Sequence, residues 1–175
     1  MHLNRRTFMQ ALAAAGALGG TGMARAVKTS PNILFGVCAG PDKAEKLKAI
    51  GYSFLEGGVA GTLKPETSDA EYAPELAKLK ACALPFRSCN GFIPGKFRLT
   101  GPEPTHDAAL DYAVKACQRA DEVGIPFIVF GSGGSRRVPD GFPREKAEAQ
   151  FVELLKHMGP LAEPRGVAIA VEPLR

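Results

Sequence analysis

Short apolar runs alternate with helical patterns along the chain from residue 33 onward. The spacing predicts helices between Pro41 and Gly51, over residues 72–82, over 106–123 and over 144–158. The apolar runs predict five β-strands at residues 33–37, 52–55, 84–89, 126–130 and 167–171. Strands that alternate with helices in this way indicate βαβ units and a parallel sheet.

Several residues predict where the helices begin and end. Asp42 is expected to cap the first helix, with Glu45 three residues later as its capping-box partner, and Gly51 is expected to end it. Pro74 is expected to confine the start of the second helix. The third helix has the clearest apolar stripe, made of Leu110, Ala113, Val114, Cys117 and Ala120. Its charged residues are expected on the other faces, namely Asp107, Asp111, Lys115 and Arg119.

The expected fold class is α/β, of the (β/α) TIM-barrel type. A barrel of eight units takes about 250 residues, and this sequence has 175 residues and five predicted strands. We therefore expect residues 33–175 to form the N-terminal part of a barrel, incomplete as given. An incomplete parallel sheet has two open edges, which makes a homo-oligomer an open possibility.

Residues 1–26 have the pattern of a targeting segment. Arg5 and Arg6 precede a weakly apolar Ala/Gly/Leu stretch, and Ala24-Arg25-Ala26 supplies the small residues of a cleavage site. The segment resembles a twin-arginine signal, with a plain secretory signal or an N-terminal anchor as the alternatives. We expect residues 27–32 to be a linker, the protein to be periplasmic or otherwise exported by this route, and no membrane span to remain after the segment is removed.

Charge content argues against nucleic-acid binding, and cysteine spacing argues against a zinc site or a redox-active cysteine pair. The targeting segment holds three of the 22 Lys and Arg residues and no acid, so the remaining 149 residues carry 19 basic against 18 acidic residues. Such a balance, with the charges spread among one another, argues against nucleic-acid binding. The four cysteines form no CxxC and have no His at metal spacing, so we expect buried free thiols.

Polar residues collect where the predicted strands end. These residues are Cys38, Glu56, Asn90, Ser132 and Glu172. The carboxyl ends of the strands open onto one mouth in a parallel barrel, so they are expected to lie near one another. Glu172 ends a strand that reads as buried, and a carboxylate there needs a cation, a metal or hydrogen-bond donors. It is either a site residue or half of a structural ion pair, and the same choice applies to Glu56.

A glycine-rich run, residues 131–137, follows the fourth strand and ends in two arginines. Its spacing does not fit GxGxxG, and it has no GKS or GKT. The run is either a tight turn or a contact to a phosphate or a sugar. Arg136 could clamp an anionic substrate, or it could be one of two solvated arginines at the rim.

Three segments resemble a known family. They read GYSFLEGGV around the second strand, IVFGSGGSRRVPDGF after the fourth, and VAIAVEPLR at the fifth. The chain is similar over residues 33–175 to the sugar phosphate isomerase/epimerase superfamily, the xylose isomerase-like TIM barrels. The resemblance implies a divalent cation (Mn, Mg, Co or Zn) held by carboxylates and a His at the ends of strands five to eight. Of these ligands the sequence contains only Glu172, and Arg175 stands where the family often has Asn.

The resemblance also implies a reaction. Two glutamates would move a proton beside a sugar carbonyl, through an enediolate, in a metal-dependent sugar or keto-sugar isomerase or epimerase. We expect Glu172 to be both catalytic and a metal ligand, Glu56, Asn90, Ser132 and Arg136 to bind a small carbohydrate, and this fragment alone to be inactive. The alternative is a non-catalytic carbohydrate-binding barrel of the cell envelope.

The same superfamily contains an AP endonuclease, which takes zinc-binding His residues from the ends of strands three and four. This sequence has no His at those two positions, which argues against a nuclease.

Overall fold

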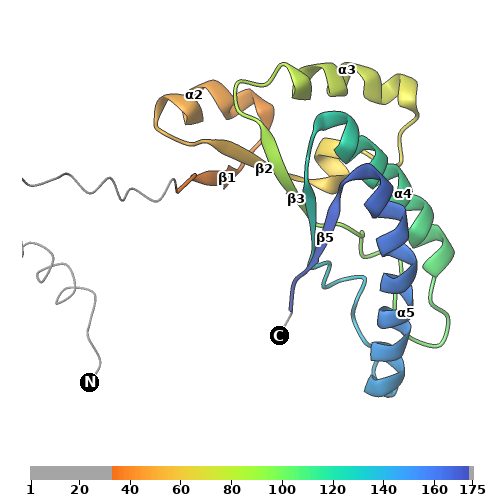
Figure 1. Cartoon of the computed structure of the whole chain (residues 1–175). Coiled ribbons are helices and arrows are strands. Elements are labelled where there is room, and N and C mark those ends of the chain that lie inside the picture. Colours follow the sequence, from red (N-terminus) through yellow and green to blue (C-terminus); the bar gives the residue numbers. More distant parts are fainter. Residues whose placement is uncertain (1–32, 174–175) are drawn as a thin grey trace, which may run out of the picture. The chain divides into compact units, whose positions relative to one another are not determined.

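The computed structural model describes residues 33–173, so the expected signal and linker lie outside the described residues. Its centre is one five-stranded sheet with the strands in sequence order and every neighbouring pair parallel (Figure 1). The strands are β1 (Gly36–Cys38), β2 (Phe54–Gly58), β3 (Phe86–Asn90), β4 (Phe127–Phe130) and β5 (Ala168–Val171). The predicted α/β class is confirmed, and the sheet is part of a barrel.

Each strand is followed by a connection that carries a helix to the next strand, except β5, where the description ends. The α-helices are α2 (Ala44–Ala49), α3 (Asp69–Lys80), α4 (His106–Val123) and α5 (Arg144–Ala162). Three short elements complete the order, the 3₁₀ turns η1 (Pro41–Lys43) and η3 (Glu163–Arg165) and the π-helical turn η2 (Val59–Leu63). The π-turn η2 directly follows β2 and therefore lies next to the carboxyl end of that strand.

Helix α4 has the bounds that the sequence predicts. Gly124 follows it with a φ of 86° and donates its N–H to Ala120 O at 2.9 Å, which is the backbone geometry that favours glycine at a helix end. Ala113, Cys117 and Ala120 are buried as expected. The expectation for Arg119 is wrong, because this residue is also fully buried.

Two helix starts differ from the prediction. Asp42 does not cap the first helix, which instead begins as the turn η1 with Gly40 at the N-cap and no side-chain cap. Helix α3 begins three residues earlier than expected and contains Pro74. Ser68 and Glu71 form a reciprocal capping box, with Glu71 N donating to Ser68 Oγ at 3.3 Å and Ser68 N donating to Glu71 Oε2 at 2.9 Å. This box anchors the helix upstream, and Pro74 removes only one backbone donor.

The hydrophobic core lies between the sheet and the helices on its outer face. Figure 1 shows α4 and α5 packed side by side along this face. Alternate strand residues point into it, including Leu55, Cys89 and Ile128, and they belong to the same buried cluster as Cys117 of α4 and Leu154 of α5. The intervening strand residues therefore face the concave side of the sheet, where the barrel axis would lie.

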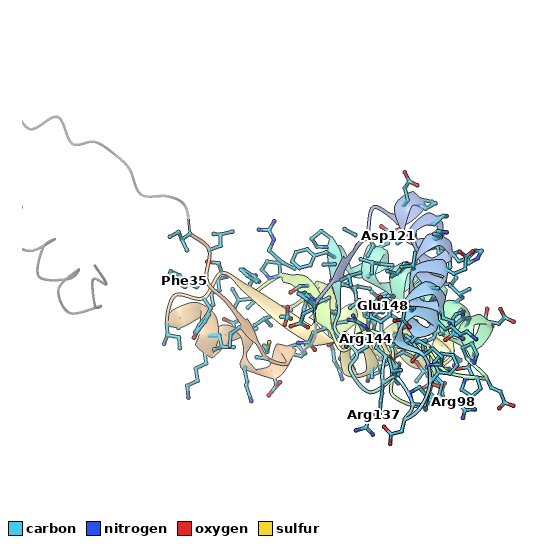
Figure 2. The ribbon with its side chains drawn as sticks, turned by 90° about the horizontal axis from the view of Figure 1, so that it is seen from below. Phe35, Arg98, Asp121, Arg137, Arg144 and Glu148 are labelled. Carbon is cyan, nitrogen blue, oxygen red and sulfur yellow. The ribbon has the colours of Figure 1, made fainter. Side chains whose placement is uncertain are left out.

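Both edges of the sheet are open within residues 33–173. Phe35, just before β1, is 63% exposed, and Figure 2 shows it beside this edge. The expectation of a buried fifth strand is wrong, because nothing in the described part of the chain pairs with the outer side of β5. Val171 is 44% exposed, and Val167 and Ile169 line a cavity of about 670 Å³ beside α5.

The four thiols are all free. Cys89 and Cys117 are buried as expected, Cys82 is half-buried, and Cys38 is exposed, which corrects the expectation for that residue. None of the helices within residues 33–173 combines the length and the apolar character needed to cross a membrane.

Candidate functional site

The parallel register places three polar residues in a row across the first three strands. Cys38 of β1 lies beside Glu56 of β2, and Glu56 lies beside Ser88 of β3. The β2–β3 register shifts between Leu55, which pairs with Phe86, and Glu56, which pairs with Ser88. This shift brings Ser88, a buried residue, opposite the carboxylate.

The Glu56 carboxylate accepts three side-chain hydrogen bonds. Cys38 Sγ donates to Oε1 at 3.1 Å, Asn90 Nδ2 donates to Oε1 at 2.8 Å, and Ser88 Oγ donates to Oε2 at 2.6 Å. Asn90 Nδ2 also lies 3.8 Å from Cys38 Sγ. We call these four residues the Glu56 cluster. The donors come from residues 18 to 34 positions away in sequence.

The hydrogen bonds decide the charge state of this cluster. Partial burial opposes ionisation of Glu56, but the bonds from Ser88, Cys38 and Asn90 together lower the pKa of its carboxyl group. The same contact raises the pKa of the Cys38 thiol, because its S–H donates to Glu56, with burial and the carboxylate charge adding to the effect. Glu56 is therefore a stabilised anion, and Cys38 is a neutral donor rather than an activated nucleophile.

A cavity of about 380 Å³ opens beside the Glu56 cluster. Its walls include Gly57 and Thr62, from β2 and the turn η2, and Glu75 of α3. A Cβ atom on Gly57 would lie 2.3 Å from Thr62 Oγ1, so only glycine permits this close approach. Glu75 is paired with Lys64 Nζ at 2.9 Å, which leaves Glu56 as the carboxylate available to a ligand.

Arg119 of α4 holds the connection that forms one wall of this cavity. Its Nη1 donates to Leu63 O and Thr67 Oγ1, each at 3.0 Å, and to Lys64 O. Its Nη2 donates to Thr67 O at 2.7 Å and to Asp69 Oδ1 at 2.9 Å. Because its bonds span residues 63–69, Arg119 fixes the path of the chain from η2 into α3.

Ser132, one of the expected substrate contacts, lies at the end of β4 and joins two loops. Its φ is 50°, a left-handed conformation that is uncommon outside glycine. Its Oγ accepts the N–H of Ile93 at 2.9 Å, and its carbonyl accepts the N–H of Ser135 at 3.1 Å. The side chain therefore bonds to the connection that follows β3.

Arg136, the other expected contact in this loop, holds the ends of β4 and β5 together. Its Nη1 donates to Phe130 O at 3.2 Å, Gly131 O at 3.0 Å and Glu172 O at 2.8 Å. The guanidinium also lies 4.5 Å from the ring centroid of Phe151. Burial lowers the pKa of Arg136, and the charge of Glu172 partly opposes this shift.

Glu172 follows β5, and its backbone is held on both sides. Its N–H donates to Phe130 O at 3.2 Å, and its carbonyl accepts the bond from Arg136. Its carboxylate is exposed and accepts no hydrogen bond from residues 33–173, so the described residues show no link between Glu172 and the Glu56 cluster. The same residues contain no group of three or more His, Cys, Asp or Glu side chains that could hold a metal ion. They do not make a metal centre by themselves.

Two residues of this region were not found by sequence reasoning. Ser88 carries a detectable signal, because it precedes Asn90 by two positions in a strand and must share its face. Arg119 carries no such signal, because its position in the helix follows the same spacing as the charged residues that face solvent.

A family model described as xylose isomerase-like TIM barrel matches residues 44–175. The chain belongs to this family. No curated protein sequence matches the chain.

Solved structures similar to this xylose isomerase-like chain include sugar-converting enzymes. A D-psicose 3-epimerase studied with D-fructose is 17% identical, with a TM-score of 0.64, over 82% of this chain and 53% of its own. The 3-keto-D-glucoside 4-epimerase from E. coli is 14% identical, with a TM-score of 0.58, over 81% of this chain and 56% of its own. A sugar phosphate isomerase/epimerase from Parabacteroides distasonis is 15% identical, with a TM-score of 0.54, over 82% of this chain and 52% of its own. The chain thus spans about half the length of these proteins, and the likeness shows the fold.

Proposed function

We propose that this chain is part of a metal-dependent sugar or keto-sugar isomerase or epimerase, with Glu172 as the catalytic base. One observation carries the proposal: the Glu172 backbone is fixed by Phe130 and Arg136 at the carboxyl end of a barrel strand, while its exposed carboxylate accepts no hydrogen bond from residues 33–173. Active sites of such barrels lie at this end. A group with a fixed backbone and a free carboxylate is suited to take a proton from a bound substrate.

The proposed reaction moves a proton beside the sugar carbonyl. Glu172 would remove the proton from the carbon next to the carbonyl, and an enediolate would form on the substrate. A divalent cation (Mn, Mg, Co or Zn) with Glu172 among its ligands would polarise the carbonyl and hydroxyl oxygens of the sugar. Because residues 33–173 provide no complete ligand set, further ligands would have to come from outside them.

The other expected site residues take different parts in this proposal. Glu56 and Asn90 line the cavity at the ends of β1–β3 and would contact the sugar directly. Ser132 and Arg136 already bond to the protein backbone, so we propose that they position the loop after β4 and the backbone of Glu172.

Hydrogen exchange in heavy water tests this function. The complete protein, supplied with Mn²⁺, is incubated in D₂O with neutral ketohexoses such as D-fructose, D-psicose and D-tagatose, and with their phosphate esters. We expect deuterium to enter the carbon next to the carbonyl of at least one of these sugars, as detected by NMR. Binding by calorimetry without any exchange would favour the alternative, a carbohydrate-binding barrel of the cell envelope.

We also propose export by the twin-arginine route, with removal of residues 1–26. Support comes from Arg5 and Arg6 before a weakly apolar stretch. Replacing both by lysine keeps the charge but removes the arginine pair. We expect the variant to stay in the cytoplasm in unprocessed form, as shown by cell fractionation and mass spectrometry, while the unaltered protein is exported. Unchanged export of the double variant by the twin-arginine route would contradict the proposal.

A further inference from the structure

The Glu56 cluster uses nearly all of its hydrogen-bond donors on its own carboxylate. Cys38 and Ser88 each donate their single hydrogen to Glu56, and Asn90 donates one of its two amide N–H groups to the same carboxylate. The atoms left over for a ligand are mostly acceptors. Glu56 Oε1 already accepts two hydrogen bonds, but Oε2 accepts only the one from Ser88 and can take another, and Asn90 Oδ1 accepts none from residues 33–173. A ligand in this cavity must therefore bring donors.

Charge narrows the kind of ligand further. The lowered pKa of Glu56 keeps it anionic, and none of the described residues that line the cavity is Lys or Arg. Lys64 is nearby, but it is paired with Glu75. Figure 2 shows the labelled Arg98, Arg137 and Arg144 at the end of the molecule near α5, opposite the edge marked by Phe35. A phosphate or carboxylate in this cavity would face a fixed negative charge with no cation to offset it.

We propose that the cavity at the ends of β1–β3 is a subsite for the neutral, hydroxyl-bearing end of the sugar, and that it rejects a phosphate or carboxylate group at that position. The inference rests on the proposed function and adds the substrate class to it. The strand order places β3 and β4 between Glu56 on β2 and Glu172 after β5. The subsite would thus hold the part of the sugar that does not react, and a sugar phosphorylated at that end would be a poor ligand.

Cys38 provides a direct measure of occupancy, because it is exposed and lines the same cavity. The experiment follows alkylation of Cys38 by iodoacetamide in the complete protein, by mass spectrometry, with half-buried Cys82 outside the cavity as the internal reference. D-fructose, D-psicose and D-tagatose are compared with their 1- and 6-phosphates. We expect at least one neutral ketose to slow the alkylation of Cys38 several-fold, and its phosphate esters to need at least tenfold higher concentrations for the same protection.

Two glutamine variants test whether Glu56 is responsible. Glu56→Gln removes the charge and keeps the size, so we expect the preference for the neutral sugar to shrink toward parity. Each variant is compared with its own rate without sugar, because loss of the carboxylate also lowers the pKa of Cys38 and speeds its alkylation. Glu153→Gln, the same change on the exposed face of α5, is the matched control and should keep the full preference.

The outcomes separate this inference from the proposed function. Equal protection by neutral and phosphorylated sugars, protection by the phosphates alone, or no protection of Cys38 by any of them would overturn the subsite, even if deuterium exchange is observed. Protection by neutral sugars without any deuterium exchange would keep the subsite and overturn the enzyme. A preference that survives unchanged in Glu56→Gln would also overturn the proposal.

Discussion

Replacing Glu172 by glutamine is expected to lower the turnover of the complete protein in its proposed reaction by about 10²–10⁴-fold, the usual contribution of a general base. The change keeps the size of the side chain and removes the charge and the basic oxygen. It should also weaken metal affinity, because a neutral amide is a poorer ligand for a hard cation than a carboxylate. Both effects are measured together, as kcat with saturating sugar and as metal content after dialysis.

This substitution should leave the fold intact. The Glu172 carboxylate is exposed and accepts no hydrogen bond from residues 33–173, while the backbone bonds to Phe130 and Arg136 do not depend on it. We expect the free energy of unfolding to change by less than about 0.5 kcal/mol, as for other surface substitutions. Glu153→Gln controls for the loss of one negative charge. If Glu172→Gln kept near wild-type turnover and metal content, the carbohydrate-binding barrel would become the better account of the chain.

Replacing Arg119 by methionine is expected to destabilise the protein by about 3–5 kcal/mol, because one buried and two part-buried carbonyls lose their donors together. Arg119 is fully buried, and its bonds go to the carbonyls of residues 63, 64 and 67 and to Asp69. Methionine fills similar space and has no donors. Urea unfolding measures the loss, and Arg119→Lys should retain part of the stability because lysine keeps the charge but not the planar arrangement of donors.

Lys115→Met is the matched control for this experiment. Lys115 lies on the same helix and also bonds to Asp69, at 3.1 Å, but its side chain is 32% exposed and Asp69 is largely in solvent. Both basic residues lower the pKa of Asp69, and the hydrogen bond from Arg119 is the largest cause. We expect the control to cost less than about 1 kcal/mol, as exposed ion pairs do. Equal losses for Arg119→Met and Lys115→Met would mean that the connection from η2 to α3 is held by other contacts.

Features that depend on a few neighbouring residues could be predicted from the sequence. The bounds of α4 follow from an apolar stripe that repeats every three or four residues and from Gly124, whose positive φ ends the helix. The order of strands and helices follows from the alternation of apolar runs and helical patterns, and short parallel βα units leave few ways to connect them. The position of Glu172 after the last strand follows from the same pattern.

Features that depend on residues far apart in sequence were decided only by the tertiary structure. The register shift between β2 and β3 places Ser88 opposite Glu56, and no local pattern predicts this register. Arg119 resembles the exposed charges of its helix, yet it is buried because carbonyls more than 50 positions earlier lie within its reach. Local patterns record which face of an element is apolar, whereas the burial of a polar group depends on which distant donors and acceptors the fold places beside it.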